Sequence, residues 1–434
     1  MKDHSGSLFD DVDASLALSI PYFAAKEDSR MSPLWKRRMH RFYNKVTKAD
    51  LIQLHDALYL SHLAYVDTVK QFRDGLAKFQ NNSWEILYGT TDSLPDLPAN
   101  FLLIHKQLAP LEEPSFKTFF EAKEQSEVLV TLVVRGTKHI SDVLSDGLLE
   151  AKDYRGGKAH GGILSSGKNL AEYYLPKLKE LHRTTGRDKI RLVIIGHSLG
   201  AGTAAIAAME LKEHIFLEVE AVGFGCPSLL SRELSTSTKD YITTVVNDAD
   251  IVPRMSGASM HNLMLDLIEY DWTDDALEDV EFTLRRGRDS LDFGNLLPDT
   301  DTVLNWIRDY LNKKVLPKYS NIERKERLPS VLIPPGQCIH IFRDGYGFTC
   351  TYTPCDFFAS VDFSPTVLDD HLIPTGYQRA VLSAVQDSDR DYSVSLYTDS
   401  NFCVMKKWTS HWNFFTIHIC IYILSFLFLV SIFK

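Results

Sequence analysis

Short apolar segments alternate with segments of helical periodicity between residues 128 and 247. Four apolar runs are predicted as buried strands, at 128–136, 190–196, 218–225 and 241–247. Two segments between them carry apolar residues at helical spacing, at 168–182 and 199–214. Because short apolar strands alternating with helices indicate βαβ units, the sequence predicts an α/β fold whose mostly parallel sheet has helices on both faces.

The flanking segments complete the predicted organisation. We expect residues 1–47 to form a polar and basic N-terminal segment that is partly disordered, with its first 30 residues polar and residues 35–48 strongly basic. Residues 48–400 form the predicted catalytic domain. It begins with an amphipathic helix over about 48–79, is interrupted by an insertion at about 255–330, and ends with closing strands at 331–342 and 348–353 and a helix at 375–385. The basic segment is either a solvated helix face or a contact for an anionic membrane surface.

Residues 413–433, NFFTIHICIYILSFLFLVSIF, contain no charged residue. At helical rise they span about 30 Å, the thickness of a bilayer core. Trp408 and Trp412 precede this segment as interfacial anchors. Two lysines, Lys406 and Lys407, also precede it, whereas a single lysine, Lys434, follows it. This asymmetry predicts a single-pass C-terminal membrane anchor with the catalytic domain facing the cytoplasm. The alternative is a buried core helix.

Net charge and cysteine spacing limit the kinds of partner, cofactor and disulfide that are expected. The formal net charge is −10, which argues against nucleic acid as a partner. The six cysteines are scattered without a CxxC pair, and the first 30 residues lack the apolar run of a signal peptide, so we expect reduced thiols. The acidic run at 271–281 lacks the spacing and glycine of an EF-hand, which favours a solvated loop over a calcium site. No cofactor or metal is therefore expected, and protein partners cannot be named.

The run Gly196-His197-Ser198-Leu199-Gly200 joins a predicted strand directly to a predicted helix. A G-x-S-x-G sequence in that context is typical of the nucleophile elbow of the α/β-hydrolase fold. Gly196 and Gly200 avoid collisions with neighbouring backbone in the strained turn, and Ser198 is expected to stand exposed above the carboxyl edge of the sheet. The alternative is a structural turn that contains a serine by chance.

A serine nucleophile needs a base and an orienting acid, which follow it in the order Asp, His in this fold. His371 is the favoured base, because it lies in the polar loop after the last predicted strands, whereas His340 falls inside a predicted strand. The loop after residue 247 offers two acids, Asp248 and Asp250, and we favour Asp250.

Five segments together resemble the successive motifs of class 3 (fungal-type) lipases: VVRGTKHISDVLSD, AHGGIL, GHSLGAG, NDADIVPR and VLDDHLIPTGYQRAV. LIPPGQCIHIF looks like the sn-1-specific diacylglycerol lipase branch. The resemblance implies an α/β-hydrolase fold and a Ser198–Asp250–His371 triad. It also implies that Thr137 and the backbone N–H of Leu199 form the oxyanion hole, and that His160 is structural. The tryptophan that fungal lipases carry in their lid is missing from residues 138–146.

The expected function is a serine-dependent lipase that hydrolyses fatty-acyl esters of glycerolipids in a bilayer, with diacylglycerol as the first candidate. A phospholipase A1 or galactolipase of the same family has the same triad and remains an alternative. A non-catalytic lipase-like scaffold is disfavoured because the triad and both elbow glycines are present. A peptidase or soluble-ester esterase would have no need of the apolar tail.

Overall fold

The computed structural model describes residues 16–30, 43–94, 97–106, 127–138, 151–290, 299–315, 317, 326–343, 347–364 and 366–387. The chain divides into two compact units. The larger one, residues 31–259 and 330–404, contains the sheet, and the smaller one includes residues 1–30 and 260–329.

An eight-stranded sheet organises the larger unit, with the strand order β1-β2-β3-β6-β7-β8-β9-β10. The five central strands are parallel, and β1, β2 and β10 pair antiparallel at the two edges. The strands are β1 (Trp84–Thr90), β2 (Asn100–His105), β3 (Glu127–Val134), β6 (Lys189–His197), β7 (Leu217–Phe224), β8 (Ile242–Asn247), β9 (Gln337–Arg343) and β10 (Phe348–Thr353). The predicted mostly parallel sheet is therefore present, and its arrangement fits an α/β-hydrolase fold.

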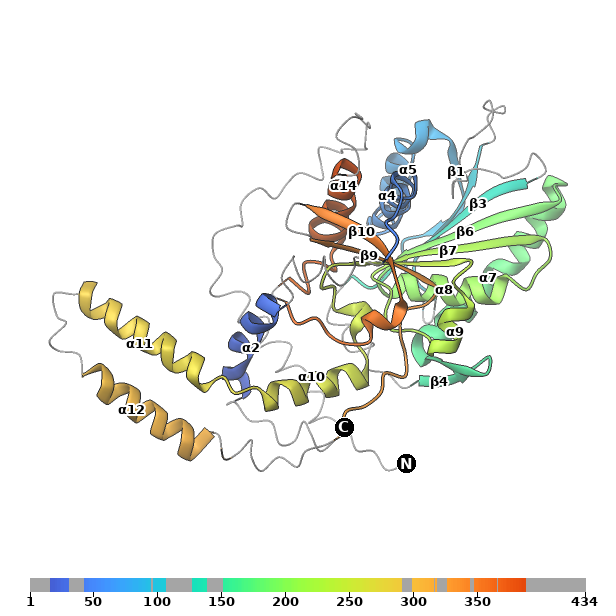
Figure 1. The fold of residues 1–434 in the computed structure, drawn as a ribbon. Coiled ribbons are helices and arrows are strands. Elements are labelled where there is room, and N and C mark those ends of the chain that lie inside the picture. Colours follow the sequence, from blue (N-terminus) through green and yellow to red (C-terminus); the bar gives the residue numbers. More distant parts are fainter. Residues whose placement is uncertain are drawn as a thin grey trace. The chain divides into compact units, whose positions relative to one another are not determined.

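Helices cover both faces of this sheet (Figure 1). On one face, α4 (Lys48–Leu63), α5 (Val69–Leu76) and α14 (Gln378–Asp387) share an apolar core with Leu129 and Val133 of β3. On the other face, α7 (Gly161–Thr185) and α8 (Leu199–Leu211) pack against Val130 and Leu132 of the same strand. All eight residues of β3 are buried. This burial on both faces explains why the strand reads as a continuous apolar run.

The predicted helix over residues 48–79 is wrong in two respects. The segment forms two helices, because Thr68 begins α5 with a capping box in which its side chain and that of Gln71 satisfy backbone N–H groups reciprocally. In addition, α4 is not amphipathic: ten of its sixteen residues are buried, including His55 and Ser61. The spacing of the leucines predicted a helix, but it did not predict that the helix packs both against the sheet and against α14.

Smaller elements complete the larger unit. A two-stranded sheet of β4 (Ala151–Tyr154) and β5 (Gly157–His160) precedes α7, and α9 (Arg232–Ser237) follows β7. Short helical turns occur at Phe79–Asn82, Val252–Arg254, Cys355–Phe358 and Ile373–Tyr377. The cysteines Cys226, Cys338, Cys350 and Cys355 are free thiols.

The smaller unit is helical, and it corrects one expectation. Its helices are α2 (Leu16–Arg30), α11 (Thr273–Ser290), α12 (Thr300–Tyr310) with a following turn at Leu311–Val315, and most of α10 (Gly257–Glu269). Residues 16–30 are ordered as a helix because apolar side chains lie within a polar sequence: Phe23 is buried, and Tyr22 stacks on Trp272 at a centroid distance of 5.8 Å. The acidic run at 271–281, expected as a loop, is largely the first half of α11.

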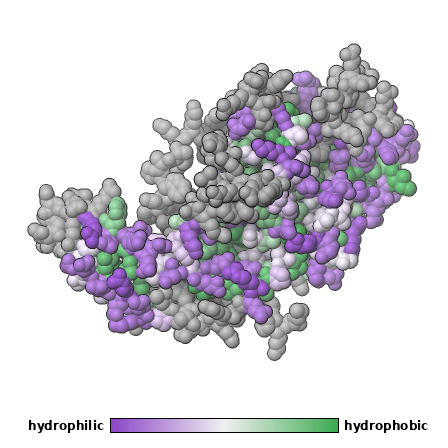
Figure 2. Space-filling model, viewed as in Figure 1, coloured by the Kyte–Doolittle hydropathy of each residue, from purple (hydrophilic) through white to green (hydrophobic). Residues whose placement is uncertain are grey.

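The predicted membrane anchor at 413–433 lies outside the described residues, as do residues 1–15 and 31–42, which include most of the basic segment. Within the part of the chain that the structure describes, no helix combines the length and the apolar composition of a membrane span. On the face shown in Figure 2, hydrophilic side chains predominate among the coloured residues and apolar ones are interspersed between them.

Candidate active site

The turn from β6 into α8 places Ser198 in a strained conformation. Its φ is +60° and its ψ is −132°, which a non-glycine residue rarely adopts. A Cβ on Gly196 would come within 2.4 Å of the Gly200 carbonyl group, and one on Gly200 within 2.5 Å of the Val134 carbonyl oxygen. Glycine is therefore required on both sides of the serine, as the elbow interpretation expects.

Ser198 is buried, with only 1% of its surface exposed, so the expectation that it stands exposed is wrong. The elbow fits tightly against the loop after β3. A Cβ on Gly136 would lie 3.2 Å from the Ser198 Cβ and 2.5 Å from the His197 carbonyl oxygen. The sequence pattern locates the turn, but it does not report how closely neighbouring segments cover it.

His371 and Asp250 complete a hydrogen-bonded series with Ser198. The Nε2 atom of His371 lies 2.9 Å from Ser198 Oγ, and its Nδ1 lies 3.0 and 3.1 Å from the two carboxylate oxygens of Asp250. Both side chains are buried. With the proton on Nδ1, the ring donates to the carboxylate and Nε2 is free to accept the serine proton. The structure thus brings together the three residues selected from the sequence.

Two further groups hold the Asp250 carboxylate. The backbone N–H of Val252 donates to Oδ1 at 3.0 Å, and the Tyr377 hydroxyl donates to Oδ2 at 2.7 Å. Burial, and then the negative charge of Asp250, raise the pKa of Tyr377 well above its usual range, so the phenol remains a donor. Sequence reasoning missed Tyr377. Its only signal was its place in a segment that the family resemblance included.

Gly225 lets the acid and the base approach each other. It follows β7 with a φ of +58°, and a Cβ there would lie 2.9 Å from both Asp250 Oδ2 and His371 Nδ1. Glycine is needed for the backbone conformation and for the space. The sequence analysis placed this residue only at the end of a predicted strand.

His197, the residue before the nucleophile, supports the loop of His371. Its Nε2 lies 2.8 Å from the His371 carbonyl oxygen, and its Nδ1 lies 2.9 Å from the Tyr65 hydroxyl. Burial, and then the neighbouring His371, hold the pKa of His197 well below its ordinary value. The ring is therefore neutral, so Nε2–H donates to the carbonyl and Nδ1 accepts from Tyr65. Sequence reasoning assigned no role to either residue.

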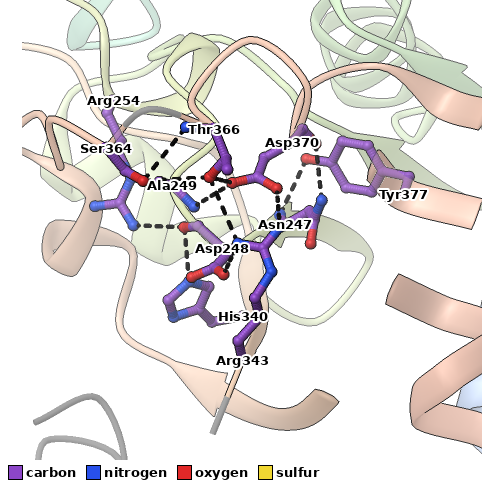
Figure 3. A network of polar contacts seen from close by, with 10 residues as sticks. All are labelled: Asn247, Asp248, Ala249, Arg254, His340, Arg343, Ser364, Thr366, Asp370 and Tyr377. Atoms are coloured by element: carbon purple, nitrogen blue, oxygen red, sulfur yellow. Dashed lines mark hydrogen bonds and ion pairs between the residues drawn. The ribbon is translucent and has the colours of Figure 1, made fainter. Parts of the chain in front are cut away.

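Asp248, the alternative acid, does not point to His371. Its carboxylate pairs with Arg343, and its backbone carbonyl accepts hydrogen bonds from His340 and Arg254 (Figure 3). Its φ of +41° turns the chain between β8 and Asp250. The two aspartates of one short loop therefore face different partners.

Two groups near Ser198 are suited to an oxyanion. The Thr137 hydroxyl oxygen is buried and has no hydrogen-bond partner, which leaves a donor available. Leu199 is the first residue of α8, so its N–H has no acceptor within the helix, and the positive end of the helix dipole lies at this position. An unpaired buried hydroxyl costs stability, and a ligand oxygen in its reach would relieve that cost.

Other histidines have structural positions. His160 begins α7, where its Nδ1 accepts the N–H of Ile163 at 3.4 Å, and His340 lies inside β9. His261 lies in α10. Among the described residues, no group of three or more His, Cys, Asp or Glu side chains could hold a metal ion.

Comparison with known proteins identifies a lipase segment. Residues 131–260 match the family model of class 3 lipases. The chain is 31% identical over 141 residues to mouse diacylglycerol lipase-beta, covering 31% of this chain and 21% of that protein. It is 31% identical over 163 residues to human diacylglycerol lipase-alpha, covering 35% and 16%. An Arabidopsis thaliana phospholipase A1-IIdelta is 32% identical over 96 residues, covering 20% of this chain and 23% of that protein.

Solved structures of fungal lipases are also similar. The lipase of Rhizopus microsporus var. chinensis aligns at 20% identity and a TM-score of 0.35, over 49% of this chain and 70% of that one. Lipase II of Rhizopus niveus aligns at 19% identity and a TM-score of 0.36, over 49% and 76%. The chain spans less than a quarter of the length of the diacylglycerol lipases that it matches. The family and sequence matches confirm the predicted resemblance to class 3 lipases and support a carboxylic ester hydrolase.

Proposed function

We propose that this protein is a serine-dependent lipase that hydrolyses fatty-acyl ester bonds of glycerolipids. The observation that carries the proposal is the series of hydrogen bonds from Ser198 through His371 to Asp250, on a strained turn that requires glycine at positions 196 and 200. A strained backbone at a buried polar site is a feature that a fold retains for chemistry. The match to class 3 lipases supports the same reaction type.

In the proposed reaction, Ser198 Oγ attacks the ester carbonyl carbon while its proton moves to His371 Nε2. Asp250 holds the Nδ1–H tautomer and stabilises the imidazolium that forms. The Thr137 hydroxyl and the Leu199 N–H donate to the tetrahedral oxyanion. The carbon–oxygen bond then breaks, and the leaving alcohol takes the proton from Nε2. Water, deprotonated by the same nitrogen, attacks the acyl-enzyme, and the fatty acid leaves as Ser198 regains its proton.

Diacylglycerol is the proposed substrate, with monoacylglycerol and a fatty acid as products. The support is the similarity to two diacylglycerol lipases, each at 31% identity, together with the class 3 lipase match over residues 131–260, which contain Ser198. The second candidate is a phospholipid cleaved in the manner of a phospholipase A1, because a plant phospholipase A1 is among the relatives. The two reactions share the triad and differ only in the contacts made to the head group.

We further propose that residues 413–433 anchor the enzyme in a membrane, with the catalytic domain on the cytoplasmic side. The support is the uncharged segment and its flanking tryptophans and lysines. A helix of this kind inserts far more firmly than one acyl chain and keeps the site at the surface where its substrate resides. A chain ending at Lys407 should retain turnover of a short soluble ester and lose about tenfold or more on vesicle diacylglycerol, through lower effective concentration. Unchanged vesicle activity would contradict the anchor.

The experiment that tests the proposed function compares four lipid classes on the purified full chain. Diacylglycerol, triacylglycerol, phospholipid and galactolipid are offered in matched vesicles or micelles, and released fatty acid is measured. Ser198→Ala serves as the inactive control. Release from diacylglycerol that disappears in the variant supports the proposal. Release from phospholipid alone supports the second candidate, and release that is equal in the variant contradicts both.

A further inference from the structure

A buried charged network joins the loop that carries Asp250 to the loop that carries His371 (Figure 3). Arg343, the last residue of β9, pairs with Asp248 through Nη1 and with Asp370 through Nη2, the second at 2.7 Å. Both carboxylates are completely buried, whereas about a third of the arginine side chain is exposed. Asp248 lies two residues before Asp250, and Asp370 immediately precedes His371. One guanidinium therefore contacts both loops.

Asp370 is also bound by neutral donors. The Thr366 hydroxyl donates to Asp370 Oδ2 at 2.6 Å, and the backbone N–H of Ala249 lies 3.4 Å from the same oxygen. The Asn247 side-chain amide donates to the Asp370 carbonyl oxygen at 2.9 Å. These bonds align the loops, but none of them supplies positive charge. Arg343 supplies positive charge to both carboxylates at once through its planar fork, whereas Arg254, a second cation beside Asp248, donates to the backbone carbonyl oxygens of Asp248 and Ser360.

Without this charge, the two carboxylates would push the loops apart. Burial, and then the negative charge of Asp248, raise the pKa of Asp370 to about 6, while Arg343 and Thr366 act in the opposite direction. Two buried carboxylates that share a site cannot both remain ionised at low cost unless a cation lies between them. The loops that would separate are those that hold Asp250 and His371 at 3.0 Å.

We propose that Arg343 is a positioning residue for ester hydrolysis, clamping the Asp250 loop to the His371 loop so that the imidazole stays on its carboxylate. Arg343 does not touch the reacting atoms. It acts through Asp248 and Asp370, and its loss lowers the rate of the chemical step and leaves substrate binding unchanged. The inference rests on the proposed function.

The main test measures turnover of a short soluble nitrophenyl ester by the full chain. Arg343→Gln should lower kcat roughly 10- to 100-fold, the scale of loss for a misplacement of about 1 Å, with little change in KM. Arg343→Lys should recover part of the loss, because an ammonium ion supplies the charge without the fork. Arg232→Gln is the matched control: it removes an exposed ion pair with Asp356 in the same unit and should leave kcat unchanged. A folded Arg343→Gln with wild-type kcat, or an equal loss in the control, would overturn the proposal.

A second measurement remains decisive if Arg343→Gln does not fold. The groups that face Asp370 are Asp248, Arg343, the Thr366 hydroxyl and Tyr377. As the pH falls through about 6, Asp370 takes up a proton and one arm of the guanidinium loses its charged partner. The acid limb of kcat/KM in the wild type should therefore be steeper than in Asp370→Asn, in which residue 370 no longer takes up a proton. Equal slopes would overturn the proposal.

The two proposals fail in different ways. If Ser198→Ala hydrolyses the ester as fast as the wild type, the proposed function is wrong. If hydrolysis depends on Ser198 but both the Arg343 variants and the acid limb behave as in the controls, only the positioning role is wrong.

Discussion

The turn around Ser198 and the loop around His371 meet at one site but are held by different kinds of contact. The turn is defined by five consecutive residues at the junction of β6 and α8, with Gly196 and Gly200 packed against backbone. The loop is held by residues far away in the sequence, including His197, Asn247 and Arg343. A turn whose conformation depends on neighbouring residues can be predicted from a short motif. A loop that is held by side chains distant in the sequence cannot be predicted in this way.

The largest expected effect separates the two aspartates of the acid loop. Asp250→Asn should lower kcat by about 10⁴-fold, because the amide no longer fixes the imidazole tautomer. Asp248→Asn should cost far less, since Asp248 faces Arg343 and acts only through the loop. Steady-state kinetics on a soluble ester compare the two variants. A severe Asp248 variant beside a mild Asp250 variant would reverse the assignment.

Removing a donor to the oxyanion should have the next largest effect on kcat. This change tests the groups around the Ser198 turn. Thr137→Val keeps the shape of the side chain and deletes the unpaired hydroxyl, so kcat should fall by about 10²- to 10³-fold. Its melting temperature should not fall, because the buried hydroxyl has no partner to lose. A variant that retains full kcat would exclude Thr137 from the oxyanion hole.

Tyr377→Phe tests whether the hydrogen bond from Tyr377 holds the Asp250 carboxylate in place for His371. The change removes a hydrogen bond to a charged carboxylate, which is worth about 1.5–3 kcal/mol. We expect kcat to fall roughly 10- to 100-fold, the equivalent of that energy. Tyr352→Phe on β10, which removes a hydroxyl bonded to the Asp50 carboxylate on α4, is the matched control and should leave kcat near the wild-type value. Equal activity in Tyr377→Phe would show that Val252 alone holds the carboxylate.

The smallest effect concerns folding of the turn. A Cβ on Gly200 meets backbone at 2.5 Å, whereas a Cβ on Gly202 meets the Ile163 side chain at 2.9 Å. Gly200→Ala should therefore destabilise the fold by about 1–3 kcal/mol, the cost of overpacking, and Gly202→Ala by less, because a side chain can move. Thermal unfolding of both variants gives the comparison. Equal losses would mean that the elbow has more space than its backbone contacts indicate.

The same difference between local and distant contacts separates the elements that could be predicted from the sequence from those that could not. The strands β3 and β6 follow from nearly continuous apolar runs, because both faces of each strand are covered. The break between α4 and α5 depends on the capping box at Thr68, which the leucine spacing concealed. Helix α2 was missed because its aromatic side chains pack against Tyr270 and Trp272, which are distant in the sequence.

The residues of the site, like the elements of the fold, could be predicted only in part. Ser198, Asp250 and His371 were selected from motif and chain order, and the structure brings them together. Gly225 and Tyr377 were not found, because their roles arise only when β7 and the turn before α14 approach Asp250. The burial of Ser198 could not be read from its motif, since covering segments come from elsewhere in the chain.

The most direct test of the central claim is covalent labelling of the full chain with a small fluorophosphonate, followed by mass spectrometry of the peptides. The account predicts a single major adduct on Ser198, no corresponding adduct in Ser198→Ala, and slower labelling in His371→Ala because the base is lost. Labelling of Ser198→Ala at the wild-type rate, or a major adduct on another serine, would contradict the assignment of Ser198 as the nucleophile.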